Sequence, residues 1–290
     1  MGALLALTSA VLYGLVDFCG GILSRRTHFA TVTVLGQIGG LLLAAAAALL
    51  VPAEAVHPTD LLWGALSGVG SGVAMHFLNR GLSRGDGGTS RLERSRELGE
   101  SVVVPVSAVT SVALSVLCGV LLLGDRPGVL AWAGIAVTVP ALWLVAGGGA
   151  DGMAGGGARD GLLASAGVAV QYLVLGQAGP TSGLWPLAAG RVAAVAAVAV
   201  LLPGAVRRAR RPTPALGVAA LAVGAGAALG LALYQLAAQR ELLAVAVVIA
   251  SLYPALPVVL GLALLHERVT AGQTVGLVGA AAATVLLAVG

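Results

Sequence analysis

The chain alternates between long apolar runs and short polar breaks. Each run is about twenty residues, long enough as an α-helix to cross the hydrocarbon core of a bilayer. The breaks contain Arg, Asp, Glu, Pro or clustered Gly, and short breaks make consecutive helices antiparallel neighbours. The pattern predicts an all-α polytopic membrane protein with ten transmembrane helices, at about residues 2–23, 30–51, 60–80, 101–123, 128–147, 161–179, 185–205, 214–236, 242–265 and 271–290.

The composition agrees with this pattern. Of the 290 residues, 58% are hydrophobic and only 10% are charged, whereas soluble proteins carry roughly 25% charged residues. A soluble one- or two-domain protein is therefore excluded, and the expected surroundings are a lipid bilayer. The net charge of +4 comes from a chain with Arg but no Lys. Basic residues in the loops of a membrane protein set its topology, so we expect no nucleic-acid partner.

Signals for catalysis are absent from the sequence. A nucleotide-binding loop of the form G-x-x-x-x-G-K-[ST] cannot occur without Lys. We find no cluster with metal-ligand spacing and no Ser-His-Asp set in which a local motif marks one member. We therefore expect no enzymatic activity, no metal, no cofactor and no built-in ATPase motor.

A glycine-rich stretch at the middle of the chain separates two similar halves. Placing Val116–Ala136 over Val258–Val278 aligns acid–Arg pairs at the ends of the preceding spans, namely Asp125-Arg126 and Glu267-Arg268. Five spans per half is an odd number, so the second half would enter the membrane in the opposite orientation. This arrangement is the inverted repeat of secondary transporters. We expect a first five-helix repeat over 1–147, a flexible linker over 148–160 and a second five-helix repeat over 161–290.

Arginine is distributed unevenly between the two sets of loops. Thirteen Arg lie on the odd-numbered links and two on the even-numbered links, and Arg191 lies within a span. Under the positive-inside rule the odd links would be cytoplasmic and both termini outside. A charged segment from Asp86 to Glu97 supplies three of these arginines, and without it the ratio is still ten to two.

Polar side chains within the spans are the candidates for a substrate or ion path, because such groups avoid lipid and face a protein interior or an aqueous cavity. Asp17 could accept a proton or balance a cationic substrate, or it could pair with Arg191 or lie near the interface. Arg191 could belong to the site or extend its guanidinium to the membrane surface. Tyr253, like Tyr234, could instead anchor a helix at that surface. The proposed path comprises Tyr13, Asp17, Gln37, His76, Asn79, Gln171, Arg191, Gln235 and Tyr253.

Prolines within the spans predict bends that could expose backbone carbonyls to a substrate path. Pro254 and Pro257 are three residues apart in the ninth span. Pro105 in the fourth span is a weaker instance. A simple packing kink is the alternative at each position.

The chain resembles the EamA branch of the drug/metabolite transporter superfamily over essentially its whole length. The resemblance rests on the segments around Tyr13 and Asp17, Pro105, Asp125-Arg126, Arg191, and Tyr253 with Glu267-Arg268. It implies ten helices in two inverted halves, a plasma-membrane location, and alternating-access movement of a small organic solute. Family members usually join spans 3 and 4 by a tight link and keep both termini in the cytoplasm. This chain departs from the first pattern through its 86–97 segment, and its Arg distribution opposes the second.

Two functional hypotheses follow. The first is a secondary transporter of a metabolite or drug, acting as a proton-coupled exporter and working as a monomer or homodimer. The alternative is a non-transporting membrane subunit or sensor that binds a partner through the charged segment at 86–97. Deleting that segment discriminates between them, because only the alternative predicts the loss of a co-purifying protein.

Overall fold

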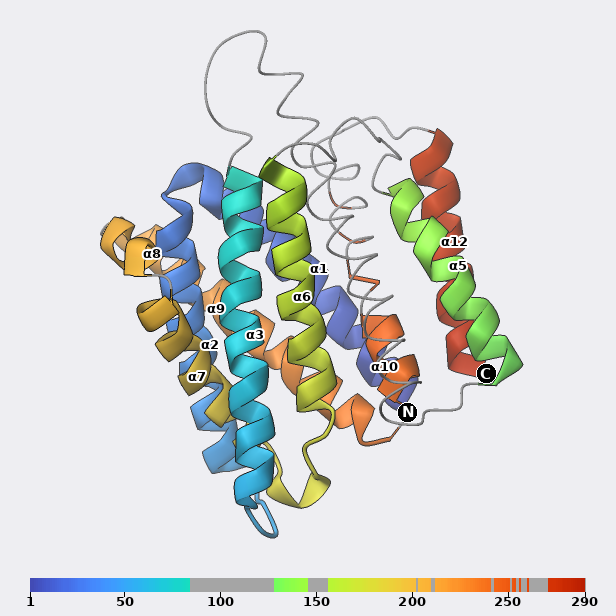
Figure 1. Cartoon of the computed structure of the whole chain (residues 1–290), viewed down its shortest axis with the longest axis horizontal. Coiled ribbons are helices and arrows are strands. Elements are labelled where there is room, and N and C mark those ends of the chain that lie inside the picture. The colour runs from blue at the N-terminus through green and yellow to red at the C-terminus, as the bar shows by residue number, and fades with distance from the viewer. Residues whose placement is uncertain are drawn as a thin grey trace, which may run out of the picture.

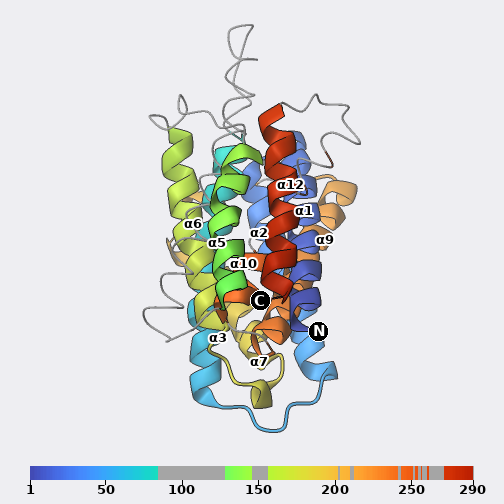
Figure 2. The same ribbon diagram turned by 90° about the vertical axis from the view of Figure 1, so that its right-hand side faces the viewer.

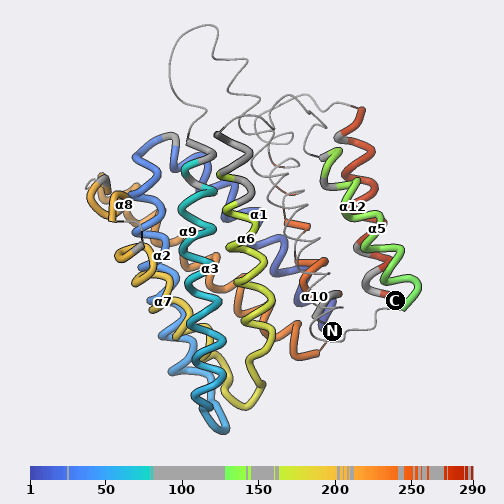
Figure 3. Tube along the Cα trace, in the orientation of Figure 1, coloured from blue at the N-terminus to red at the C-terminus, as the bar shows by residue number. Residues whose placement is uncertain are grey.

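The computed structural model describes residues 1–83, 128–145, 156–201, 203–209, 212–240, 243–250, 252–253, 256, 260 and 271–289. Its path can be followed in Figure 3. All regular structure within these residues is helical: α1 (Gly2–Arg26), α2 (Phe29–Leu50), α3 (Pro58–Ser83), α5 (Val129–Val145), α6 (Gly156–Leu175), the short 3-10 helix η3 (Pro180–Ser182), α7 (Trp185–Leu201), α8 (Pro203–Arg208), α9 (Pro214–Ala238), α10 (Leu243–Ala250) and α12 (Ala271–Val289).

Local sequence signals explain several helix boundaries. Proline is the first residue of α3, α8 and α9, a position where its missing N–H removes no helical hydrogen bond. His28 caps α2, since its Nδ1 accepts a hydrogen bond from the Ala30 N–H at 3.2 Å. Gly183 follows η3 with φ of 53°, a left-handed conformation that glycine adopts without strain.

Nine of the ten expected spans contain a helix in the described residues, and the expected span at 101–123 lies outside them. Two boundaries differ from expectation. Helix α6 begins at Gly156, within the stretch predicted to be a flexible linker. The Asp160 side chain is fully buried there and pairs with Arg80, so the first turn is held by a contact that composition does not reveal. The seventh span is also shorter than predicted, because α7 ends at Leu201 and the separate helix α8 begins at Pro203.

The helices form two three-helix blocks and one separate pair. Helix α3 packs along α6 and α7, and helix α9 packs along α1 and α2. We call these groups the α3 block and the α9 block; contacts between α2 and α7 join them. Helices α5 and α12 pack on each other to one side, as Figures 1 and 2 show. Each block therefore combines helices from both halves of the sequence.

Glycines bring the helices of each block into backbone contact. A Cβ atom placed on Gly68 would lie 1.7 Å from the Gly190 carbonyl oxygen, and one on Gly64 would lie 1.9 Å from that of Pro186. In the other block, a Cβ on Gly224 would lie 1.7 Å from the Gly36 oxygen. Lipid provides no hydrophobic drive for helices to associate, so close approach of small residues supplies the van der Waals packing.

The principal helix pairs are unchanged when each helix is exchanged for the one five expected spans later. Under this exchange the α3–α6 pair corresponds to α9–α1, and the α3–α7 pair corresponds to α9–α2; both resulting pairs are also present. The α2–α7 and α5–α12 pairs each correspond to themselves. The amino end of α1 and the carboxyl end of α12 lie toward the same end of the molecule (Figure 1). An even number of membrane crossings requires this placement.

Polar and apolar side chains are distributed as expected for a protein in lipid. Large apolar residues lie on the outside, including Leu50 at 81% exposure and Val200 at 75%, whereas Gln37, Gln171 and Arg191 are buried. By length and composition, four helices in the described part could cross a membrane, over Gly2–Ser24, Phe29–Leu50, Pro58–Leu78 and Pro214–Ala238. The described chain is thus an all-helical structure of the membrane type.

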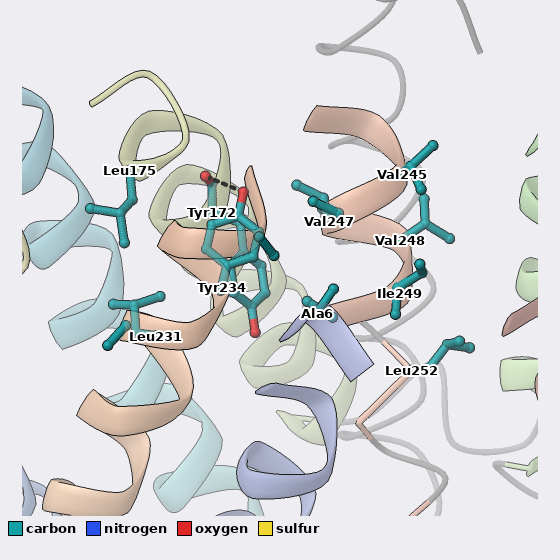
Figure 4. Packing of buried hydrophobic residues seen from close by; sticks show 14 of the residues in the cluster. Ala6, Tyr172, Leu175, Leu231, Tyr234, Val245, Val247, Val248, Ile249 and Leu252 are labelled. Carbon is teal, nitrogen blue, oxygen red and sulfur yellow. Dashed lines mark hydrogen bonds between the residues drawn. The ribbon is translucent and has the colours of Figure 1, made fainter. Parts of the chain in front are cut away.

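The largest buried apolar cluster joins α10 to the rest of the molecule. Val247, Val248 and Ile249 of α10 are fully buried and belong to one cluster with Ala6 of α1. Figure 4 shows Ala6 between α10 and the rings of α6 and α9. This packing places the end of α10, and Tyr253 after it, close to the candidate site.

Candidate functional site

A cavity lies between the α3 block and the α9 block. Its volume is about 50 Å³, room for only a few water molecules. Its polar lining includes Tyr13 and Asp17 from α1, Gln37 from α2, Ser71 from α3, Gln171 and Tyr172 from α6, Arg191 from α7, and Tyr253. Six of the nine residues proposed for the path from sequence therefore meet here, from helices that are far apart in the chain.

The Asp17 carboxylate faces the cavity without a direct partner. Among the described residues, no hydrogen bond or ion pair reaches it, and no ion pair joins it to Arg191. The predicted alternative in which Asp17 pairs with Arg191 is therefore wrong for this conformation. A carboxylate held at a cavity wall without a partner can accept a proton or bind a cation.

The Arg191 side chain is buried rather than extended to the membrane surface. Only 4% of the residue is exposed, so the alternative in which its guanidinium reaches the interface is wrong. Its stem passes Gly40, where a Cβ would lie 3.4 Å from Arg191 Cδ. Nη1 donates to Ser71 Oγ at 3.2 Å, whereas buried Nη2 has no hydrogen-bond partner among the described residues. Ser71 on α3 therefore fixes one side of the guanidinium.

All four tyrosines of the chain form a row beside the cavity. The Tyr13 ring centroid lies 6.1 Å from that of Tyr253 and 6.0 Å from that of Tyr172, and the Tyr172 centroid lies 4.5 Å from that of Tyr234. Gln171 Nε2 donates to Tyr13 Oη at 3.1 Å. Tyr234 and Tyr253 are 0% and 4% exposed, so their predicted alternative as surface anchors is wrong.

The row also links the two blocks. Tyr234 Oη, from α9, donates to the Tyr172 carbonyl oxygen at 2.7 Å (Figure 4). Gln235 Nε2, on the next residue, donates to the Gly183 carbonyl oxygen at 3.0 Å. The α9 block is thereby hydrogen-bonded to α6 and to the link before α7.

The remaining predicted site residues lie elsewhere. Gln235 is outside the cavity lining because its amide serves the helix contact just described. His76 is also outside it, with its ring 5.9 Å from Phe29 and 5.3 Å from Phe77. The Asn79 side chain, Pro105, Pro254, Pro257, Asp125, Arg126, Glu267, Arg268 and the 86–97 segment are outside the described residues.

The sequence interpretation missed two polar residues of the cavity wall. Ser71 lies in a glycine-rich part of α3 and was interpreted as part of the helix packing. The spacing of Ser67 and Ser71, four residues apart and so on one helix face, was the available signal. Both are buried, and Ser67 Oγ donates to the Gln171 carbonyl oxygen at 2.8 Å. Tyr172 directly follows Gln171 in a long apolar run, and no local signal distinguished it.

Hydrogen bonds and an ion pair fix the two ends of α3, one to the segment that joins α6 to α7 and the other to α6. At one end the Asp60 carboxylate accepts hydrogen bonds from Ser182 Oγ at 2.6 Å and from the Gly179 N–H at 3.0 Å. At the other end Arg80 pairs with Asp160, and its guanidinium lies 4.6 Å from the Phe77 ring centroid. These contacts make the α3 block a single rigid wall of the cavity.

Comparison with known proteins shows the fold but no family. No family model and no curated protein matches the chain. A solved structure described as "Crystal structure of protein" is similar, with 17% sequence identity and a TM-score of 0.70. The match covers 98% of this chain and 96% of the other. At this identity the similarity establishes a shared fold over the full length.

Proposed function

We propose that the protein is a secondary transporter that moves a small organic solute across the cytoplasmic membrane by alternating access. The supporting observation is the cavity between the two blocks, which holds Asp17 and Arg191 among largely apolar helices. Ionisable groups at membrane depth are expensive to maintain and usually mark a transport path.

The helix pairing supports an architecture of two inverted five-helix repeats, 1–147 and 161–290, within ten membrane spans. The pairs are preserved when the halves are exchanged, as an internal two-fold axis would require. The cavity lies where the exchanged helices meet, with α1 and α6 on facing walls. Substrate sites of inverted-repeat transporters lie at this kind of interface.

The two blocks are suited to act as the moving bodies. The α3 block is fixed internally by Asp60 and Arg80, and the α9 block by the glycine contacts between α2 and α9. The hydrogen bonds of Tyr234 and Gln235 between the blocks bridge one end of the interface. Rocking of one block against the other would break these bonds and open the cavity toward that end.

We further propose that the transport is proton-coupled export and that Asp17 carries the proton. A solute panel added to proteoliposomes with an internal pH dye measures solute-dependent proton movement. We expect Asp17→Asn to reduce this movement at least tenfold. Glu54→Gln, which removes an exposed carboxylate far from the cavity, should leave it unchanged. Equal proton movement in Asp17→Asn and the unmutated protein would contradict the coupling role.

A further inference from the structure

A series of hydrogen bonds joins the α3 block to the α9 block on one side of the cavity. Nearest the cavity, Gln171 Nε2 on α6 donates to the Tyr13 hydroxyl on α1 at 3.1 Å. Next along α6, the Tyr172 carbonyl oxygen accepts a hydrogen bond from the Tyr234 hydroxyl on α9 at 2.7 Å. Because these two bonds join different blocks, both must break when the blocks separate on this side.

The series ends at the segment that joins α6 to α7, which Figure 1 shows in yellow at the lower end of the molecule. There Gln235 Nε2 on α9 donates to the Gly183 carbonyl oxygen at 3.0 Å. The segment is also held against the start of α3, because Ser182 Oγ donates to the Asp60 carboxylate at 2.6 Å. The three bonds between the blocks, which we call the tyrosine gate, are those of Tyr13 with Gln171, Tyr234 with Tyr172, and Gln235 with Gly183.

Tyr13 connects this gate to the charges of the cavity. It lies four residues before Asp17, so the two side chains share a face of α1. Its phenol group interacts electrostatically with Asp17 and with Arg191 on α7. The ring packs closely on α9, because a Cβ on Gly230 would lie only 3.0 Å from Tyr13 Cδ2. The ring is therefore fixed, and the hydroxyl is the part of Tyr13 that can reorient.

The orientation of the Tyr13 hydroxyl depends on the charge of Asp17. A hydroxyl donates one hydrogen bond and can accept two. An ionised Asp17 attracts the hydroxyl proton, which leaves the lone pairs of the phenol oxygen to the Gln171 amide. When Asp17 is protonated this attraction is lost, and the positive charge of Arg191 competes with the amide for the lone pairs. Protonation of Asp17 therefore weakens the bond between Tyr13 and Gln171.

We propose that Tyr13 is a positioning residue that couples the protonation of Asp17 to the opening of the tyrosine gate. The gate is closed while Asp17 is ionised and loosens when Asp17 takes up a proton. The proton thus controls access to the cavity from the end at which Gly183 lies. This inference rests on the proposed transport function, because it assigns the regulation of the same cavity.

The other side chains of the lining keep their charge when the pH falls from alkaline to acidic. Arg191 on α7 stays protonated, and tyrosine hydroxyls such as those of Tyr172 and Tyr253 ordinarily lose their proton only near about pH 10. Helices α2, α3 and α9 contribute only uncharged side chains to the lining. His76 on α3 lies outside it, and the Asp17→Asn variant below separates its contribution from that of Asp17.

Cysteine reactivity measures the gate directly. In a sensor protein with Cys19 and Cys118 changed to Ala, Met75→Cys places a thiol in the cavity lining. Glu54→Cys, in a second sensor, places one in the exposed α2–α3 link, which is hydrogen-bonded to the segment before α7 and so marks the gate end. A membrane-impermeant thiol reagent is applied to oriented vesicles from that end, at alkaline and at acidic pH. The rate at Met75→Cys divided by the rate at Glu54→Cys corrects for the ionisation of the thiol.

With Tyr13 intact, we expect this ratio to rise about fivefold at acidic pH, the effect of losing one hydrogen bond. Tyr13→Phe keeps the ring and removes the hydroxyl, so the ratio should be high at both pH values, and Asp17→Asn should give the same result. Tyr234→Phe should also raise the ratio but keep its pH dependence, because Tyr13 and Asp17 remain. Gly21→Ala is the matched control on α1, because no atom lies within 4 Å of the added Cβ, and it should leave both ratios unchanged.

Two results would overturn the inference. The first is a ratio that does not respond to pH while Tyr13 and Asp17 are intact. The second is a Tyr13→Phe protein that retains the pH response, as expected for Tyr234→Phe, because Tyr13 would then have a structural role alone. If Tyr13→Phe fails to fold, Gln171→Met removes the donor of the same bond and should give the same high ratio at both pH values.

The outcome also separates this inference from the transport proposal, because the thiol assay needs no solute. A pH response that depends on Tyr13, in a protein that moves no solute in proteoliposomes, would support the inference and contradict transport. Solute flux together with a pH response that Tyr13→Phe leaves intact would support transport and overturn the role of Tyr13.

Discussion

In two places, an acidic residue and an arginine from different halves of the chain lie near one another. The two pairs are arranged differently. Arg80 on α3 and Asp160 on α6 meet in a direct ion pair, with Arg80 Nε also donating to Asp160 Oδ2 at 3.2 Å. Asp17 on α1 and Arg191 on α7 line one cavity without touching. The first pair lies within the rigid α3 block, and the second lies across the interface between blocks. The two charges that pair directly hold α3 and α6 together. The two charges that are separated remain available to a bound solute.

The largest expected difference between the two pairs is in stability. Removing one partner of a buried ion pair costs about 3 kcal/mol, so Arg80→Met should lower the free energy of unfolding by that amount. Asp17→Asn should leave it unchanged or raise it, since it removes a charge that has no partner. Thermal unfolding in detergent measures both.

The double variant Arg80→Met with Asp160→Leu tests whether the buried Asp160 charge causes the stability loss of Arg80→Met. Replacing both charges by apolar groups should recover most of the lost stability, because no buried charge then remains. If the double variant is as unstable as Arg80→Met, or if Asp17→Asn is equally destabilising, the distinction between the pairs does not hold.

A smaller effect is expected from the hydrogen bond that positions Arg191. Ser71→Ala removes the acceptor of Nη1, and hydrogen bonds to charged groups contribute about 1.5–3 kcal/mol. We expect roughly tenfold weaker solute affinity, measured as the solute concentration that gives half-maximal proton movement in the proteoliposome assay. Ser24→Ala is the control, because the buried Ser24 Oγ has no partner among the described residues and its removal should be neutral. Unchanged solute affinity in Ser71→Ala would show that Arg191 is positioned without it.

The smallest effect concerns the packing behind Tyr13. A Cβ on Gly230 would lie 3.0 Å from Tyr13 Cδ2, so Gly230→Ala should displace the ring and weaken its hydrogen bond with Gln171. Overpacking of this kind lowers the free energy of unfolding by about 1 kcal/mol, so we expect a small decrease in thermal stability and a several-fold loss of solute affinity. Gly21→Ala should show neither effect. A Gly230→Ala protein with the original affinity would mean that the ring adjusts freely.

The apolar pattern predicted most of the fold because each span had to satisfy its backbone within a helix of about twenty residues. It also identified Asp17 and Arg191, since charges within apolar runs are conspicuous. It could not determine whether the two side chains touch, because that depends on how α1 and α7 pack. The gap between them became visible only in the structure.

The differences between the predicted site and the cavity lining have a common origin. Gln235 and His76 were grouped with the path because they are polar residues within spans, yet such groups also serve contacts between helices, as Gln235 does with Gly183. Ser71 and Tyr172 were missed because their role depends on partners more than 60 residues away, on α7 and α9. Asp160 likewise was assigned to a flexible linker because its partner, Arg80, lies in another helix.

The most direct test of the account is whether the cavity between the two blocks is reached from both sides of the membrane. In a variant with Cys19 and Cys118 changed to Ala, Ala227→Cys places a thiol in the cavity wall, and Ala44→Cys places one in the buried core as a control. Membrane-impermeant thiol reagents are then applied to oriented vesicles from either side. The account predicts that Ala227→Cys reacts from both sides in separate experiments, while Ala44→Cys reacts from neither. Reaction of Ala227→Cys from one side only, or from neither, would contradict alternating access to this cavity.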